Sequence, residues 1–170
     1  WPSRHLCFGP NMRLLAPQSG AMGYGVPAAI AASLAEPDRL ALCFAGDGDF
    51  QMTCQELATA AQHGATPLIL ILDNGIYGTI RAHQERQFPA RVFGTTMVNP
   101  DFTALAHAYG FHAEKVDTTP AFAAAFDRAL AATKAGTGAV VTLAIAPEAI
   151  APRQRISTLR EAALAAQIKT

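Results

Sequence analysis

The stretch FAGDGDFQMTCQE, residues 44–56, decides the fold and raises the first question about function. An apolar run at 39–46 ends in Gly46, and Asp47 and Gly48 follow before helix-forming residues begin. A short, continuous apolar run is typical of a strand buried on both faces. Two glycines around a carboxylate at the end of such a strand suit three kinds of site: a calcium loop, a dinucleotide-binding turn, or a turn that holds a metal and a diphosphate.

The rest of the chain alternates between strands and helices. Two more apolar runs, at 66–74 and 138–146, predict strands, and the segment FHAEKV at 111–116 is a further predicted strand. This alternation predicts an α/β fold with a doubly wound parallel sheet, that is, a three-layer αβα sandwich. The predicted helices lie at 27–35, 53–64, 99–110, 119–136 and 156–169.

Local signals mark the ends of two of these helices. Thr53 and Glu56 stand three residues apart and match a capping box, while Gly64 marks the end of the same helix. Asn99 or Asp101 marks the start of the next helix.

Polar residues follow two of the predicted strands. Asp47 comes just after the strand at 39–46, and Asp73 and Asn74 end the run at 66–74. In open parallel sheets, ligands bind beyond the carboxyl ends of the strands. We therefore expect these side chains to share one edge of the sheet.

Two of the three site types match the sequence poorly. Asp47 and Asp49 are spaced like the first ligands of an EF-hand, but the places that need Gly and Glu hold Met52 and Ala58. Residues 20–25 read GxxGxG instead of the GxGxxG of a dinucleotide site, which leaves that site as a weaker alternative.

The metal-diphosphate turn matches better. Gly46 and Gly48 let the backbone approach an anion, and the amides of Gly48 and Asp49 would face phosphate oxygens. A carboxylate beside a phosphate is unfavourable unless a cation lies between them, so Asp47 is predicted to hold a divalent metal. Mg²⁺ prefers about six oxygen ligands, and Asn74 with a backbone carbonyl just after it could supply two of them.

These residues resemble a known motif. The GDG at 46–48 and the Asp73-Asn74 pair, separated from it by a gap of 24 residues, are similar to the thiamine diphosphate motif. The segments SGAMGYGVPAAIAASLAEPDR (19–39) and DNGIYGTI (73–80) resemble those of acetolactate synthase-like and benzoylformate decarboxylase-like enzymes. The resemblance runs from about residue 17 to 145.

The resemblance implies a site for thiamine diphosphate and Mg²⁺. It assigns the metal to the side chains of Asp47 and Asn74 and to the carbonyl of Ile76. It also implies that Met22 supports the bent cofactor and that the Gly20 carbonyl accepts a hydrogen bond from its amino group. The cofactor-binding residues that it implies are Gly20, Ala21, Met22, Gly46, Gly48, Asp49, Phe50, Asn74, Ile76, Tyr77, Gly78 and Thr79.

Some positions depart from the family pattern. Asp73 replaces the first Asn of the usual pair, and Asp49 stands where Ser is common, although only its backbone is needed there. Ile80 stands where pyruvate decarboxylase-type enzymes carry a glutamate. The resemblance therefore implies action on a 2-oxo acid, by decarboxylation or condensation, without assigning the substrate or the acceptor.

The resemblance also implies that one part of the enzyme lies outside this chain. In the family, a glutamate on a separate pyrimidine-binding domain activates the cofactor, so we expect no catalytic residue here and no activity of the isolated chain. Residues 1–170 are expected to form one C-terminal thiamine diphosphate-binding domain, with an irregular lead-in at 1–18 and a tail at 150–170. The start at Trp1 favours a piece of a longer multidomain enzyme.

Two alternatives stay open. The chain could be the β subunit of a split 2-oxo acid decarboxylase, or a non-catalytic flavodoxin-like domain that binds a nucleotide or phosphate. If the resemblance to the thiamine diphosphate family holds, Tyr77 and Thr79 could line the thiazolium pocket or cap the next helix. Residues 83–85 could belong to a mobile active-site loop or to a solvated helix face, and Met22 could be plain core.

Composition narrows the classes of partner and location. The formal net charge is zero, which argues against a nucleic-acid partner. Cys7, Cys43 and Cys54 show no CxxC spacing, and Cys43 is expected to be a small core residue. We expect a cytoplasmic protein without a membrane span. The resemblance implies a homo-oligomer that pairs with a pyrimidine-binding domain, and leaves open whether the parent enzyme carries FAD.

Overall fold

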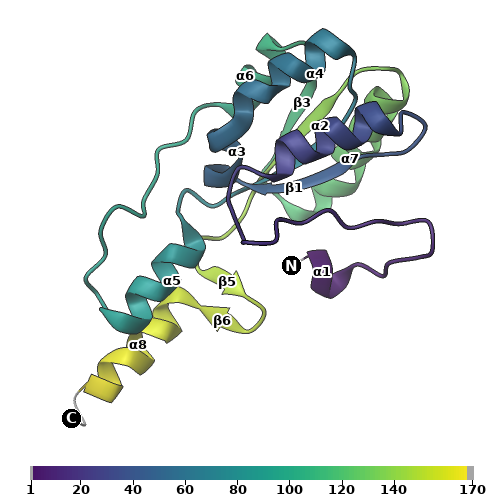
Figure 1. Cartoon of the computed structure of the whole chain (residues 1–170). Helices are drawn as coiled ribbons and strands as arrows, with labels where there is room; N and C mark the ends of the chain where they lie inside the picture. Colours follow the sequence, from purple (N-terminus) through teal and green to yellow (C-terminus); the bar gives the residue numbers. More distant parts are fainter. Residues whose placement is uncertain (1, 168–170) are drawn as a thin grey trace. The chain divides into compact units, whose positions relative to one another are not determined.

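A computed structural model describes residues 2–167 of the chain, and it divides into two compact units (Figure 1). The sheet unit comprises residues 7–73 and 99–144. The helical unit takes its described residues from 2–6, 74–98 and 145–167. The expectation that 1–170 form a single domain stays a prediction.

The sheet unit is built on four parallel strands in the order β1-β2-β4-β3. All four predicted strands are present, each somewhat shorter than predicted, and they confirm the predicted parallel sheet. Their bounds are β1 Leu42–Gly46, β2 Leu68–Asp73, β3 His112–Val116 and β4 Ala139–Ala144.

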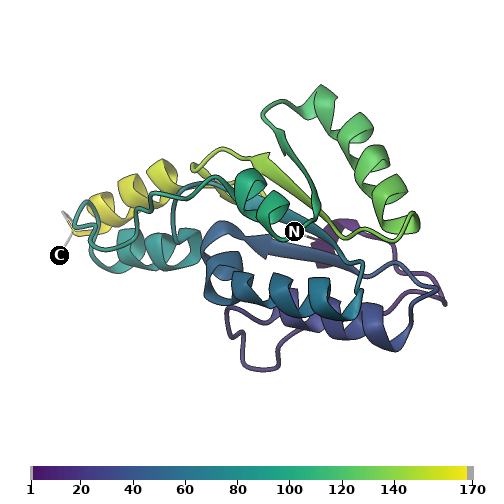
Figure 2. The same ribbon diagram turned by 90° about the horizontal axis from the view of Figure 1, so that it is seen from above.

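Helices cover both faces of this sheet (Figure 2). One face packs against α2, α3, α4 and α6, and the other packs against α7, which gives the three layers expected from the sequence. The helical elements of the sheet unit are α2 Gly25–Ala35, α3 Asp47–Thr53, η1 Cys54–Glu56, α4 Leu57–His63, α6 Phe102–Ala108, η2 Thr119–Ala121 and α7 Phe122–Lys134.

The connections explain the strand order. The chain steps from β1 to β2 through α3 and α4, and α6 precedes β3 on the same face. It then returns through α7 on the opposite face and inserts β4 between β2 and β3. A change of face accompanies a change of direction when the crossovers keep one hand, as parallel crossovers do.

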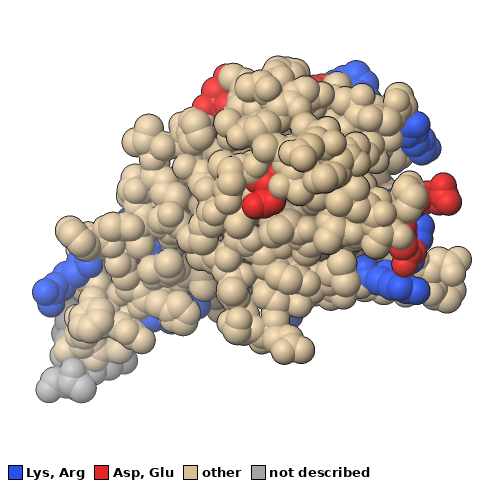
Figure 3. Space-filling view, turned by 45° about the horizontal axis from the view of Figure 1, so that its top comes forward, with Lys and Arg blue, Asp and Glu red and all other residues tan. Residues whose placement is uncertain are grey.

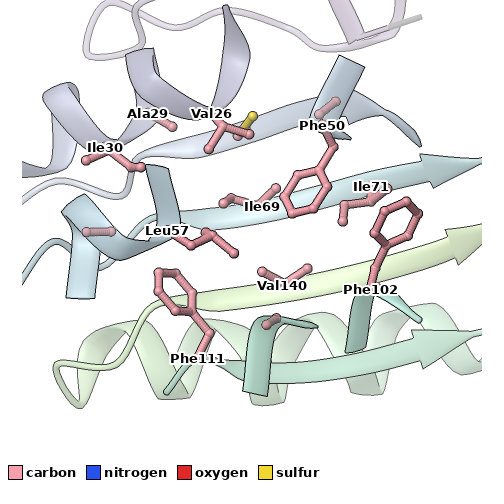
Figure 4. Close-up of a cluster of buried hydrophobic side chains, with 14 of the residues drawn as sticks. Val26, Ala29, Ile30, Phe50, Leu57, Ile69, Ile71, Phe102, Phe111 and Val140 are labelled. Carbon is pink, nitrogen blue, oxygen red and sulfur yellow. The ribbon is translucent and has the colours of Figure 1, made fainter. Parts of the chain in front are cut away.

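Aromatic and branched side chains fill the larger core, between the sheet and α2, α3, α4 and α6 (Figure 4). Phe50 of α3 and Phe102 of α6 meet edge to face, with ring centroids 5.3 Å apart and ring planes at 84°. Both side chains are buried, and Ile71 of β2 belongs to the same cluster. This packing fixes α3 directly beyond the end of β1.

The predicted helix boundaries are partly right. Gly64 ends α4 in the left-handed conformation at φ +70°, and the Asp101 carboxylate caps α6 by accepting hydrogen bonds from two backbone amides. The predicted capping box is wrong. Thr53 donates its hydroxyl to the Gly23 carbonyl, and Glu56 accepts from Thr59. The reason is that the chain is already helical from Asp47 onward: Thr53 ends α3, and although η1 follows it, neither Thr53 nor Glu56 makes a side-chain cap hydrogen bond.

The helical unit centres on the packing of α5 against α8. A short antiparallel pair, β5 and β6, precedes α8 and was not predicted. The predicted tail helix is confirmed over Ile156–Gln167, and its last two residues lie outside the described part of the chain. The elements are α1 Pro2–His5, α5 Gly78–Gln87, β5 Ala149–Ala151, β6 Gln154–Arg155 and α8 Ile156–Gln167.

A buried ion pair joins α5 to α8. The Glu85 side chain has 0% exposure and accepts hydrogen bonds from both Nε and Nη2 of Arg160, the former at 2.9 Å. Arg81 and the backbone amide of Ala90 also donate to this carboxylate, at 3.3 and 3.0 Å. The hydrogen bonds from Arg160 are the main reason why the pKa of Glu85 falls to about 2. Residues 83–85 lie within α5 and not in a loop, and His83 is exposed as the helix-face alternative expected, but Glu85 is buried.

On the face drawn in Figure 3, charged side chains lie mostly toward the margins, and other residue types form most of the surface. Between residues 2 and 167, the structure has no helix with the length and apolar character needed to cross a membrane.

Candidate functional site

The ends of β1 and β2 bring two of the predicted polar residues together. Gly46 pairs with Leu72 in the parallel register, so Asp47 and Asp73 each follow directly at neighbouring strand ends. The chain then passes from the sheet unit into the helical unit between Asp73 and Asn74. The shared sheet edge expected for Asp47 and Asp73 is therefore present.

Asp47 is a buried carboxylate at the first position of α3, with 3% exposure. Its Oδ1 accepts a hydrogen bond from the Gly48 amide at 3.0 Å, and its Oδ2 accepts one from Nδ2 of Asn99 at 2.7 Å. Gly46 precedes it in an extended conformation and, lacking a side chain, makes no side-chain cap. The predicted diphosphate contact of the Gly48 amide would have to replace or share its bond to Asp47.

Asn99 is a residue of this edge that sequence reasoning did not assign to the site. Its Nδ2 lies 2.7 Å from Asp47 Oδ2 and also 2.7 Å from Asp73 Oδ1. Nε2 of Gln51 donates to its Oδ1 at 2.9 Å. The sequence marked Asn99 only as a potential helix start, and no spacing rule links it to Asp47, 52 positions away.

The glycine-rich turn before α2 is exposed at its tip. Gly20 and Gly23 adopt left-handed conformations, at φ +66° and +81°. Between them Ala21 is exposed, and the Met22 side chain has 41% exposure. An exposed methionine on a turn of this kind is not part of the core, so the plain-core alternative for Met22 is wrong.

The Asp49 side chain ties this turn to α3. Its carboxylate accepts a hydrogen bond from the Gly23 amide, while the Thr53 hydroxyl donates to the Gly23 carbonyl at 3.0 Å. A Cβ on Gly23 would lie 3.1 Å from the Cβ of Met52 and 3.2 Å from the methyl group of Thr53. Sequence reasoning gave Asp49 a backbone role alone, but its side chain joins two of the predicted cofactor-binding segments.

Two residues of this region, Phe50 and Cys43, have buried side chains. The Phe50 side chain is fully buried in the core, so any contact with a cofactor would come from its backbone. Burial, with a smaller effect of the Asp49 charge, raises the pKa of the Cys43 thiol to about 12. Cys43 is thus a neutral thiol at physiological pH, as expected for a small core residue.

In the helical unit, Asn74 and Ile76 form a local turn. Oδ1 of Asn74 accepts a hydrogen bond from the Ile76 amide at 3.1 Å. Ile76 lies opposite Thr96 in an isolated antiparallel bridge. The hydrogen bonds of this bridge are made by the residues just before and just after Ile76, and not by Ile76 itself. The amide and carbonyl of an extended residue in this position point away from the partner segment. The Ile76 carbonyl therefore lies on the same side as the Asn74 side chain.

The residues after this turn begin α5. Tyr77 is the residue before the first helical position and donates its amide to the Thr95 carbonyl at 2.9 Å, and Thr79 is exposed. A Cβ on Gly78 would lie 2.8 Å from Cδ1 of Ile150 and 3.4 Å from Nδ2 of Asn74. A larger residue at 78 would therefore require the end of the Ile150 side chain to move, while the Asn74 side chain would be in ordinary contact.

The donor atoms at these positions suit Mg²⁺. A carboxylate at Asp47, an amide oxygen at Asn74 and a backbone carbonyl at Ile76 are hard oxygen ligands of the kind that Mg²⁺ prefers. Among residues 2–167, no group of three or more His, Cys, Asp or Glu is arranged to hold a metal ion. The predicted ligand set is accordingly of mixed carboxylate, amide and carbonyl type, as expected for a metal that shares its coordination with a phosphate.

The fold and the strand-end turns define an α/β domain that carries its polar residues at the carboxyl edge of a parallel sheet. Residues 1–142 match the family described as thiamine pyrophosphate enzyme, C-terminal TPP binding domain. The chain belongs to this family, and it represents the TPP-binding C-terminal domain of acetolactate synthase-like enzymes.

Similar proteins agree with this assignment. The chain is 38% identical to the acetolactate synthase large subunit of Parasynechococcus marenigrum over 68% of its length, and 36% identical to the acetolactate synthase isozyme 2 large subunit of Escherichia coli over 76%. It spans only 19% and 24% of those two proteins. It also matches the structure of a Rhodococcus jostii thiamine diphosphate-dependent 4-hydroxybenzoylformate decarboxylase, with a TM-score of 0.68 and 35% identity over 76% of this chain and 24% of the other.

Proposed function

We propose that this chain binds thiamine diphosphate through Mg²⁺, as the C-terminal part of an enzyme that decarboxylates or condenses 2-oxo acids. The observation that carries the proposal is the position of the buried Asp47 carboxylate beside Asp73, where neighbouring parallel strands end and Asn74 follows. The family membership and the relatives support the same conclusion.

In the proposed site each residue has a separate task. Asp47, Asn74 and the Ile76 carbonyl hold the metal, and the amides of Gly48 and Asp49 bind the diphosphate. When bound, thiamine diphosphate supplies a carbon nucleophile and an electron sink for the loss of carbon dioxide. The remaining cofactor contacts are proposed for Gly20, Ala21, Met22, Gly46, Phe50, Tyr77, Gly78 and Thr79.

The exposed Met22 side chain is free to make its proposed contact with the cofactor. Covering an apolar side chain with a ligand is favourable, because it removes apolar surface from water. Asp49 and Thr53 hold this turn through Gly23, so Met22 projects from a fixed backbone and not from a free loop.

The rest of the enzyme is part of the proposal. The activating glutamate would come from a pyrimidine-binding domain, in the same or another chain, so the isolated chain would be inactive. A cytoplasmic homo-oligomer is the proposed context. The substrate is proposed only as a 2-oxo acid, and FAD in the parent enzyme is not assigned.

Thermal unfolding of the chain tests the binding proposal. A ligand that binds the native state raises the unfolding midpoint. We expect Mg²⁺ with thiamine diphosphate to raise it and Mg²⁺ with ADP to leave it unchanged. The rise should disappear in Asp47→Ala but persist in Asp38→Ala, a change at an exposed carboxylate of the same unit. A rise with ADP alone would instead favour a nucleotide-binding domain.

The activity is tested on the longer protein. A full-length parent that contains this segment should release carbon dioxide from pyruvate or benzoylformate when supplied with thiamine diphosphate and Mg²⁺. The isolated chain should release none. If the isolated chain turned over a 2-oxo acid, the proposal that the activating group lies outside it would be wrong.

A further inference from the structure

Asn99 holds the proposed metal ligand Asp47 by a hydrogen bond and contacts the neighbouring Asp73 as well. Its side-chain amide stands between two carboxylates of the sheet unit and donates one hydrogen to each, Asp47 Oδ2 and Asp73 Oδ1, both at 2.7 Å. An amide nitrogen carries two hydrogens, so these two contacts use its whole donor capacity. Hydrogen bonds to ionised acceptors are the stronger kind, and the distances are in the range typical of them.

The two carboxylates fix the orientation of the Asn99 amide, because the reverse orientation would set its oxygen against both of them. On its other side, Gln51 of α3 donates to Asn99 Oδ1 at 2.9 Å. Asn99 is consequently held as a donor toward Asp47 and does not present its oxygen to a metal.

Asn99 also joins the two points at which the chain leaves and rejoins the sheet unit. The chain leaves after Asp73 and returns at Asn99, and the segment between them, 74–98, contains Asn74 and Ile76. The hydrogen bond between Asp73 and Asn99 therefore ties the two ends of the segment that carries the other proposed metal ligands.

We infer that Asn99 is a positioning residue for the metal. It sets the orientation of the Asp47 carboxylate, offsets the repulsion between Asp47 and Asp73, and fastens the base of segment 74–98. This inference rests on the proposed function, because it takes Asp47 as a metal ligand. Partners that orient a metal ligand from outside the coordination sphere commonly change metal affinity about 10- to 100-fold when they are removed.

The role of Asp73 follows from the same contact. Asp73 stands where the family pattern has an asparagine, so this edge bears one negative charge more than the pattern requires. Two carboxylates around one nitrogen repel each other unless a donor or a cation lies between them. Asn99 supplies the donor, and Asp73 keeps a second negative charge near the metal, which favours cation binding.

Manganese binding tests the inference, with Mn²⁺ as the probe and its free concentration followed by electron paramagnetic resonance. The titration is made on the chain with saturating thiamine diphosphate. Asn99→Ala should bind Mn²⁺ about 10- to 100-fold more weakly than the wild type. Asn99→Ser keeps one donor and should lie between the two. Asn11→Ala changes an exposed asparagine of the same unit and should bind like the wild type.

A second readout separates positioning from a loss of fold. A loosened Asp47 should tolerate Ca²⁺, which accepts irregular geometry, better than Mg²⁺, which requires a near-ideal octahedron. Competition against bound Mn²⁺ should therefore show a higher ratio of Ca²⁺ to Mg²⁺ affinity in Asn99→Ala and Asn99→Ser. A global loss of stability would lower the affinities for both ions together and leave this ratio unchanged.

The outcomes distinguish this inference from the proposed function. If the wild type binds Mn²⁺ no better than Asp47→Ala does, the proposed metal site is wrong and the inference fails with it. If the wild type binds and the Asn99 variants bind as tightly or more tightly, with an unchanged ion ratio, the inference alone is overturned. If Asn99→Ala does not fold, the affinity and ion ratio of Asn99→Ser decide the matter.

Discussion

Replacing Arg160 with alanine should loosen α8 from α5 by about 2 kcal/mol. The magnitude follows from Glu85, whose side chain has 0% exposure and whose pKa falls from 4.5 to about 2, mainly through its hydrogen bonds to Arg160. That change corresponds to roughly 3 kcal/mol in favour of the ionised, folded state. We discount it because the Arg160 side chain is 35% exposed and solvent screens part of the interaction.

Hydrogen exchange of the α8 amides measures this loss. A decrease of about 2 kcal/mol in the opening free energy should speed their exchange roughly 30-fold. Arg155→Ala is the matched control, because Arg155 lies in the same unit and meets Glu148 at 3.9 Å with both side chains well exposed. Exposed pairs of this kind contribute about 0–1 kcal/mol. If Arg160→Ala sped exchange no more than Arg155→Ala, the argument from the buried pair would be refuted.

The same ion pair predicts a pH dependence with a definite sign. The pKa of Glu85 is lower in the folded state than its ordinary value of 4.5, so the stabilisation is fully present above pH 4.5. It should be lost as the pH falls from about 4.5 through about 2. Urea unfolding followed by circular dichroism should show this decline in the wild type and a smaller one in Arg160→Ala. Equal declines in both proteins would count against the assignment.

Three further predictions concern the sheet unit. Gly23→Ala should lower the free energy of unfolding, measured in urea, by about 2 kcal/mol, because φ at Gly23 is +81° and an added Cβ would lie 3.1 Å from the Cβ of Met52. A loss below about 0.5 kcal/mol would contradict this. Thr142→Val should raise the same free energy by about 1 kcal/mol, because the buried Thr142 hydroxyl has no hydrogen-bond partner among the described residues; a lower value would contradict this. Cys43, with a thiol pKa of about 12, should react with Ellman's reagent only upon unfolding, unlike the exposed Cys7; equal rates in native protein would show that the Cys43 thiol is accessible.

The sheet and its helices could be predicted because their signals are local. Continuous apolar runs became β1, β2 and β4, and the first two of these runs ended at a glycine and at a carboxylate. The helix at Asp47–Thr53 was harder to see, because Gly48 and two aspartates disfavour a helix by propensity. Burial of Phe50 against Phe102 stabilises it, and that contact joins residues far apart in the sequence.

The sequence predicted the strand-end residues of the candidate site but not the residue that contacts and orients them. Asp47 and Asp73 follow from the rule that parallel strands end at one edge of the sheet. Asn99 contacts both, but it precedes a helix and looks like a capping residue. Glu85 looked solvated because it stands in a polar segment, and its partner Arg160 lies 75 positions away. Such contacts depend on tertiary packing, which a local pattern does not contain.

The most direct test of the central claim is a crystal structure of the chain grown with thiamine diphosphate and Mn²⁺, with anomalous scattering used to locate the metal. The account predicts one metal peak about 2.1 Å from an Asp47 carboxylate oxygen, Oδ1 of Asn74 and the Ile76 carbonyl, with two diphosphate oxygens completing most of its coordination. Asn99 should still donate to Asp47 in that structure. A metal bound without Asp47, or thiamine diphosphate bound away from the ends of β1 and β2, would contradict the account.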